Sequence, residues 1–285
     1  MHSLQKQLIR INVCNNNSLK LLHQGTRDND DINVLKCNNS GILILDQIIT
    51  NDNFYENDEH YDKINKNPQL IIDDKRRINQ YKKIIKDKTI LDFGCGQGDF
   101  LKLSLKYTRK SYGVELHKKN RKDLNETGIK VHKSINEFKS RKFDIVFLNH
   151  VFEHLTNPIE VIKSIKDFMH KDSLLIIEVP HANDFLIKKM DNLNFKNFTF
   201  WSEHIVLHTK QSMRKIFESC NYFSYKFEFF QRYPISNHIH WMNEGKPGGQ
   251  NIYSFLNDKS LTKSYDDFLI KNEWTDTLIG YFKIS

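Results

Sequence analysis

A short run of glycines follows an apolar segment near residue 90. Residues 89–93 have the composition of a buried strand, and Gly94, Gly96 and Gly98 follow at every second position. Glycine reaches backbone conformations closed to other residues and lets a ligand lie against bare main chain. The pattern therefore predicts a strand, a ligand-binding turn and then a helix. A nicotinamide-dinucleotide site would need its third glycine where this chain has Asp99, so the pattern argues against one.

A second group of residues has the types that bind zinc. His150, Glu153 and His154 form an H-x-x-E-H pattern, which in one family of zinc peptidases places both histidines on one helical face. Here the pattern directly follows a predicted buried strand, and Asn157-Pro158 restarts the chain shortly afterwards. Too little helix remains to present two ligands, so a zinc peptidase is not expected.

Other histidines have spacings that a metal site can use. His204 and His208 form one such pair, and His238 and His240 form another. Neither pair has a nearby cysteine or a helix to fix the geometry of a zinc site. We therefore expect no bound metal ion.

Strand and helix patterns alternate between residues 89 and 179 and continue towards the end of the chain. This alternation predicts a mainly parallel sheet whose strands are joined by crossover helices. The predicted strands are 89–93, 111–116, 143–148, 173–179, 223–233 and 277–284, and the predicted helices are 73–86, 99–109, 158–170, 209–219 and 259–271.

The first part of the chain has a different pattern. Short apolar pieces such as 32–35 and 41–45 are separated by Asn- and Asp-rich turns. We predict a small β-rich module over residues 1–67 and a larger domain over residues 68–285.

A late segment, residues 233–250, is polar, aromatic and rich in turn residues. A surface loop is the expected structure. Asparagine, histidine and tryptophan bind sugars and other polyhydroxylated ligands through hydrogen bonds and an aromatic face. Asn237, His238 and Trp241 are therefore candidate substrate contacts.

Composition excludes several classes of protein. The 285 residues are 39% hydrophobic and 27% charged, as in a globular chain rather than a disordered one. The net charge is +8, but basic residues are spread along the whole length, so a nucleic-acid partner is not expected. Four widely separated cysteines, no secretory signal and no apolar run of about 18 residues predict a cytoplasmic protein without membrane insertion.

These motifs together resemble those of the class I S-adenosylmethionine-dependent methyltransferases. Leu91 to Gly98 is similar to the first motif of that family, and Glu115 closes the second strand where the family places a carboxylate that holds the ribose hydroxyls. Segments 134–137, 143–149 and 174–180 are similar to its adenine contact, fourth strand and fifth strand. The resemblance implies an α/β, Rossmann-like sheet that is mostly parallel with an antiparallel last strand.

The same resemblance implies S-adenosylmethionine as cofactor and S-adenosylhomocysteine as product. A carboxylate suits the ribose because it accepts two hydrogen bonds at once. Tyr55 and Tyr61 lie where relatives bring a tyrosine over the cofactor. The implied cofactor-binding residues are Asp92, Gly94, Gly96, Gly98, Glu115, Leu116, Asn136, Asn149 and Tyr61.

A finer resemblance is to the nucleotide-sugar methyltransferases. In those relatives a strand ending in Glu-Val-Pro is followed by an aromatic-x-Glu-His stretch, as at 178–180 and 201–204 in this chain. The resemblance implies that Glu203 or His204 is the base. It also implies that other histidines surround the methyl position, namely His154 and His181.

Many nucleotide-sugar methyltransferases begin with a zinc module of two Cys-x-x-Cys pairs. This chain keeps one cysteine of each pair, Cys14 and Cys37, and has asparagine or serine in the other places. Those residues are poor zinc ligands, so we expect a metal-free remnant that packs against the larger domain.

The chemistry that the resemblance implies is displacement of a methyl group from a sulfonium. This reaction requires alignment of the nucleophile and removal of one proton. We expect O-methylation, ahead of C-methylation, of a small polar acceptor such as a sugar nucleotide or another phosphorylated precursor of a surface polysaccharide. The larger C-methylating relatives carry a further C-terminal domain beyond the length of this chain. The alternatives are an RNA or protein methyltransferase and a non-catalytic cofactor-binding protein, and the sequence leaves the oligomeric state open.

Overall fold

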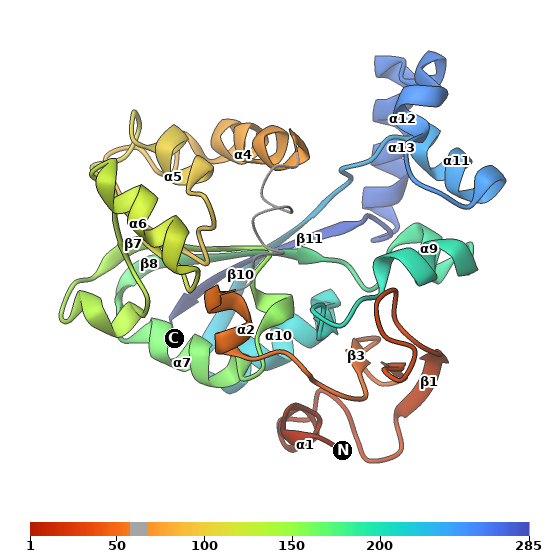
Figure 1. Ribbon diagram of the computed structural model, residues 1–285, viewed down its shortest axis with the longest axis horizontal. Helices are drawn as coiled ribbons and strands as arrows, with labels where there is room; N and C mark the ends of the chain where they lie inside the picture. Colours follow the sequence, from red (N-terminus) through yellow and green to blue (C-terminus); the bar gives the residue numbers. More distant parts are fainter. Residues whose placement is uncertain (58–67, 285) are drawn as a thin grey trace.

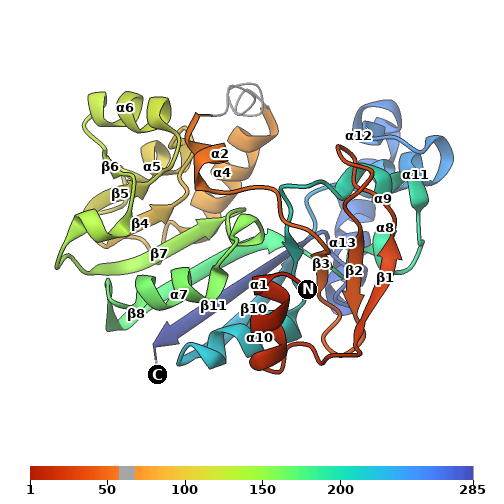
Figure 2. The same cartoon turned by 60° about the horizontal axis from the view of Figure 1, so that its bottom comes forward.

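The computed structural model describes residues 1–57 and 68–284 and is built around a seven-stranded sheet (Figures 1 and 2). Every neighbouring pair from the β6 edge to β8 is parallel, and β11 is antiparallel to both of its neighbours. The predicted fold is therefore confirmed. In spatial order the strands are β10 (Tyr222–Phe230), β11 (Thr277–Ile284), β8 (Met169–Pro180), β7 (Phe143–Asn149), β4 (Thr89–Phe93), β5 (Lys110–Val114) and β6 (Lys130–His132).

Helices cover both faces of this sheet, so its central strands are buried on both sides. In β7, Ile145 and Phe147 belong to the core on one face, and Val146 and Leu148 belong to the core on the other. Figures 1 and 2 place α4 (Pro68–Tyr81), α5 (Asp99–Ser104) and α6 (Lys118–Glu126) on the first face, and α7 (Pro158–Lys166) and α10 (Lys210–Ser219) on the second.

The N-terminal part forms a second, antiparallel sheet. Its strands are β1 (Leu19–His23), β2 (Val34–Cys37) and β3 (Leu43–Leu45), preceded by α1 (Ser3–Arg10) and followed by α2 (Asp52–Asn57). A fourth strand, β9 (Val206–Leu207), comes from much later in the chain and pairs with β3. The two parts of the chain therefore share a strand, which no local pattern in the N-terminal residues could predict.

The N-terminal cysteines, Cys14 and Cys37, are buried free thiols. The Ser18 hydroxyl oxygen lies 3.2 Å from the sulfur of Cys37, so a serine occupies part of the space around the two thiols.

The late polar segment was predicted as a loop, and that prediction is wrong. Residues Ile235–Glu244 form a helix, α11, in which Asn237, His238 and Trp241 are buried. Its ends carry helix signals that the polar composition obscured, because Pro234 precedes its first turn and Gly245 ends it with a φ of 65°. Short helices also join the strands nearby, namely α8 (Phe185–Lys188), α9 (Leu193–Thr199) and α12 (Gly249–Ile252).

The last helix, α13 (Lys259–Lys271), and β11 have the predicted bounds. Across residues 1–57 and 68–284, no helix combines the length and apolar character required to span a bilayer.

A buried ion pair attaches α4 to the sheet. Glu178, near the end of β8, is fully buried, and its Oε1 accepts hydrogen bonds from Arg77 Nη2 at 2.7 Å and Arg76 Nη2 at 2.5 Å. Burial alone would raise the pKa of Glu178, but the charges of Arg77 and Arg76 and the nearby ring of His150, whose Nε2 lies 3.5 Å from Oε1, lower that pKa well below its ordinary value. The carboxylate is therefore ionised and depends on these cations.

Replacing Arg77 by methionine leaves this buried charge with an incomplete set of partners. We expect the Arg77→Met variant to lose about 3–5 kcal/mol of unfolding free energy, because one half of a buried ion pair is removed. Arg109→Met is the matched control, since Arg109 pairs with Asp144 at 3.0 Å but is 62% exposed, and its loss is expected to cost at most about 1 kcal/mol. Urea denaturation measures both values, and equal losses would contradict the dependence of α4 on Glu178.

Candidate active site

A large cavity lies across the carboxyl ends of β4, β5, β7 and β8. This is the edge at which parallel α/β sheets bind their ligands. The cavity has a volume of about 1740 Å³ and extends from the glycine turn after β4 to α11. It exceeds the roughly 300–1,000 Å³ of an ordinary small-molecule pocket, so two ligands fit side by side.

The glycine turn forms one end of this cavity, as predicted. Gly94, Gly96 and Gly98 have φ values of 76°, 54° and 73°, which lie in the region that favours glycine. A Cβ atom added at Gly94 would lie 2.5 Å from a methyl carbon of Val151, in the segment after β7. The turn therefore packs directly against the segment that carries the H-x-x-E-H residues.

Glu115 joins the turn to the end of β5. The Gly96 N–H donates a hydrogen bond to Glu115 Oε2 at 2.7 Å, and the His117 N–H donates one to Oε1 at 2.7 Å. The side chain is buried, and this burial raises the pKa of Glu115. Glu115, Leu116 and the three glycines all line the cavity, so the structure brings together these predicted cofactor residues.

Asp92 and Asn149 form a second pair at this end. Asn149 Nδ2 donates a hydrogen bond to Asp92 Oδ1 at 3.3 Å, and both residues line the cavity. Burial, assisted by the charge of Asp74, raises the pKa of Asp92 to about 7.

Two of the implied cofactor residues are not placed in the cavity. Asn136 is exposed, and its neighbours Ser134 and Ile135 line the cavity in its stead. Tyr61 lies outside the described residues. Tyr55, the alternative tyrosine, does line the cavity, and its ring packs edge to face against His154 with centroids 6.0 Å apart.

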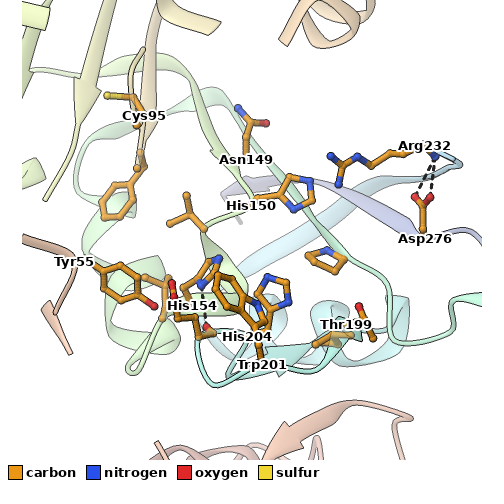
Figure 3. Close-up of a pocket in the computed structure, with 18 of the residues that line it drawn as sticks. Tyr55, Cys95, Asn149, His150, His154, Thr199, Trp201, His204, Arg232 and Asp276 are labelled. Atoms are coloured by element: carbon orange, nitrogen blue, oxygen red, sulfur yellow. Dashed lines mark hydrogen bonds between the residues drawn. The ribbon is translucent and has the colours of Figure 1, made fainter. Parts of the chain in front are cut away.

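The middle of the cavity is formed by aromatic and imidazole rings (Figure 3). The rings of His154 and His204 have centroids 5.1 Å apart, and Trp201 packs on both. His154 Nδ1 donates a hydrogen bond to the main-chain carbonyl of Glu203 at 2.8 Å. The structure therefore brings together three residues predicted near the methyl position, His154, Glu203 and His204.

His204 does not pair with His208, the partner that its spacing suggested. His208 is buried and stacks on Phe152 with centroids 4.7 Å apart. The family resemblance implied that His154 and His204 both lie near the methyl position, whereas the spacing of the histidines could not pair them, because the two residues lie on segments that are distant in the sequence.

The histidines differ in their electrostatic state. Burial lowers the pKa of His181 and of His204 to about 3. His181 Nδ1 donates a hydrogen bond to the carbonyl of Thr275 at 3.1 Å. Burial would also lower the pKa of His150, but its hydrogen bond to Glu153 and the Glu178 carboxylate, 3.5 Å from its Nε2, raise that pKa above its ordinary value. His181 and His204 are therefore neutral at pH 7 and, as free imidazoles, are weak bases.

The predicted substrate contacts, Asn237, His238 and Trp241, line the far end of the cavity. Their polar groups already have partners within the protein. Asn237 Oδ1 accepts a hydrogen bond from Gly248 N–H at 3.2 Å, and His238 Nδ1 lies 2.7 Å from the Tyr265 hydroxyl. Their role in substrate binding stays a prediction.

Arg27 is a cavity residue that sequence reasoning missed. Its guanidinium lies over the Trp201 ring at 4.6 Å and the Phe198 ring at 5.5 Å. Within residues 1–57 and 68–284, no carboxylate forms an ion pair with it. Arg232, another lining residue, differs because it is paired with Asp73. No local pattern around Arg27 signals its position, which depends on the docking of the N-terminal part.

Comparison with known proteins identifies the family. Residues 64–223, more than half of the chain, match the family model described as a methyltransferase domain. A search of the curated proteins gives no match.

Solved structures of methyltransferases are similar to this chain, and the first of those below shares its fold. A SAM-dependent methyltransferase from Archaeoglobus fulgidus is 21% identical, with 76% of this chain and 95% of that chain covered and a TM-score of 0.52. Magnesium protoporphyrin IX methyltransferase from Synechocystis is 12% identical, with 76% and 84% covered and a TM-score of 0.47. The family match and the strand order lead to one conclusion: the chain belongs to the methyltransferase domain family, and it is a class I enzyme that uses S-adenosylmethionine.

Proposed function

We propose that this enzyme transfers the methyl group of S-adenosylmethionine to an oxygen of a small anionic acceptor. A sugar nucleotide or another phosphorylated precursor of a surface polysaccharide has the required chemistry. One observation carries the proposal: a single cavity contains the glycine turn with Glu115 at one end and, beyond the neighbouring rings of His154 and His204, the cation of Arg27, which has no ion-pair partner among residues 1–57 and 68–284.

Cofactor binding is assigned to the glycine-turn end. Each Glu115 oxygen already accepts one main-chain N–H, which orients the carboxylate and leaves further lone pairs for two ribose hydroxyls. Asp92 and Asn149 are assigned to the amino acid part of the cofactor, and Ser134 and Ile135 to the adenine side.

Acceptor binding is assigned to the chamber beyond the histidines. Arg27 offers a guanidinium whose plane is already held against Trp201, and a planar fork of N–H donors suits phosphate oxygens. Trp201 offers an aromatic face of the kind that packs against sugar rings. His154 and His204 lie between the two ligands, where the acceptor hydroxyl must lose its proton.

Replacing Glu115 by alanine tests the cofactor assignment. Two hydrogen bonds to a charged group, at about 1.5–3 kcal/mol each, are lost, so the Kd for S-adenosylmethionine is expected to rise about 100-fold or more. Glu126→Ala, at a residue that is 66% exposed on α6, is expected to bind like the wild type. Isothermal titration calorimetry measures both affinities, and circular dichroism checks folding. An unchanged Kd in a folded Glu115→Ala protein would refute the ribose assignment.

Replacing Arg27 by glutamine tests the acceptor assignment. Wild-type enzyme is first assayed with radiolabelled S-adenosylmethionine against sugar nucleotides, sugar phosphates and the matched neutral sugars, and phosphorylated acceptors are expected to be preferred. For the preferred acceptor, Arg27→Gln is expected to raise KM about 10- to 100-fold, because one charged hydrogen-bonding partner is lost.

Arg27→Lys is the matched control, since it keeps the charge and is expected to recover part of the loss. The Kd for S-adenosylmethionine is expected to stay unchanged in both variants. Equal turnover of phosphorylated and neutral acceptors by the wild type, or an unchanged KM in Arg27→Gln, would contradict an anionic acceptor at this position.

A further inference from the structure

Three side chains with metal-binding atoms converge in the middle of the cavity wall. Glu153, His154 and His204 each place one ligand atom within 4.8 Å of the others. Glu153 is fully buried, whereas both histidines line the cavity, and their rings, labelled in Figure 3, pack edge to face with centroids 5.1 Å apart. The group thus has a closed side in the protein and an open side towards the ligands.

The hydrogen bond of His154 fixes the tautomer that a metal site requires. Its Nδ1 donates to the Glu203 carbonyl at 2.8 Å, so in the neutral ring Nε2 carries the free lone pair. That Nε2 atom lies on the side of Glu153, 3.9 Å from Oε1. A main-chain carbonyl that holds the far nitrogen in this way is the usual support of a metal-binding histidine.

The other two residues carry unsatisfied polar atoms. His204 Nδ1 is buried and has no hydrogen-bond partner within the part of the chain that the structure describes. Glu153 Oε1 lies 3.2 Å from His150 Nδ1, but Oε2 is buried and likewise lacks a hydrogen-bond partner among residues 1–57 and 68–284. A buried carboxylate oxygen without a partner is costly, and a bound cation would remove that cost.

We propose that Glu153, His154 and His204 bind one divalent transition-metal ion, with its open coordination positions facing the cavity. Two imidazoles and one carboxylate suit Zn²⁺, Co²⁺ or Mn²⁺, and three protein ligands with a free position are typical of a catalytic rather than a structural site. This proposal departs from the expectation of no metal, which came from the short segment after His150, the spacings of His204 with His208 and of His238 with His240, and the missing cysteines of the N-terminal part.

The role of this ion rests on the proposed function. The acceptor hydroxyl coordinates the ion, which lowers the pKa of that hydroxyl so that its proton passes to solvent water at neutral pH. The resulting oxygen attacks the methyl carbon of S-adenosylmethionine. The new O–CH₃ bond forms as the S–CH₃ bond breaks. The electron pair of the S–CH₃ bond stays on sulfur, so the sulfonium becomes the neutral thioether of S-adenosylhomocysteine. The ion is unchanged, and no strongly basic side chain is needed.

Metal binding by the untagged full-length protein tests the site. The protein is freed of metal with a chelator and then dialysed against Zn²⁺, Mn²⁺ or Co²⁺. Mass spectrometry measures the bound metal, and visible absorption reports the ligands of bound Co²⁺. We expect one equivalent of ion in the wild type. Glu153→Gln, which keeps the side-chain shape, and His204→Ala are each expected to weaken binding at least about tenfold, by analogy with the effect of altering metal-site residues.

His170→Ala is the matched control, because His170 is 40% exposed and lies outside the cavity, and it is expected to bind metal like the wild type. Binding of S-adenosylmethionine shows that each variant is folded. No stoichiometric metal in the wild type, or wild-type binding in both Glu153→Gln and His204→Ala, would overturn the site. Full methyl transfer by the metal-free enzyme would overturn the assigned role. Metal binding without binding of S-adenosylmethionine would refute the proposed function while the metal site stands.

Discussion

The active-site edge of this protein is governed by the cost of burying carboxylates. Neighbouring parallel strands end at one edge of the sheet, and each of the central strands places an acidic residue at or just beyond that end. All of these residues are buried: Asp92 lies near the end of β4, Glu115 directly follows β5, Glu153 follows shortly after β7, and Glu178 lies near the end of β8. Removing a carboxylate from water is unfavourable unless the protein supplies donors or cations in return. The elements around the cavity are arranged to supply them.

Each carboxylate is satisfied in a different way, and the differences divide the cavity into regions. Glu178 forms ion pairs with two arginines of α4 and so attaches that helix to the sheet. Glu115 accepts hydrogen bonds from two main-chain N–H groups and so joins the glycine turn to the end of β5. Glu153 has one imidazole partner, and its other oxygen, beside His154 and His204, has no hydrogen-bond partner within the part of the chain that the structure describes. Its incomplete set of partners is why this region, between the cofactor and acceptor ends, is assigned a cation.

Local patterns in the sequence, together with the family resemblance, were enough to predict the sheet and to bring the glycine turn and Glu115 to one place. The glycine turn and Glu115 could be predicted because both directly follow neighbouring strands, β4 and β5, and parallel neighbouring strands end at the same edge of the sheet. The prediction for Asn136 was off by one or two residues, since Ser134 and Ile135 line the cavity and Asn136 does not. The helix α11 was missed because its buried face is made of polar and aromatic residues that are typical of turns.

The place of Arg27 in the cavity could not be predicted, because this part of the cavity is assembled from segments that are distant in the sequence. Arg27 reaches the cavity because its N–H bonds to the Phe200 carbonyl at 2.8 Å and Asp28 accepts a hydrogen bond from Ser202 N–H at 2.9 Å. Pairing of β3 with β9 fixes the same docking. His154 and His204 also lie on segments that are distant in the sequence. Their contact therefore follows from the packing of these segments and not from a local sequence pattern.

A crystal structure with bound S-adenosylhomocysteine tests the account most directly, since the account claims that one cavity orients the cofactor towards the histidines. The account predicts that both ribose hydroxyls bond to Glu115 and that the thioether sulfur faces His154 and His204. A cofactor bound outside this cavity, or bound within it with the sulfur turned away from these histidines, would contradict the account.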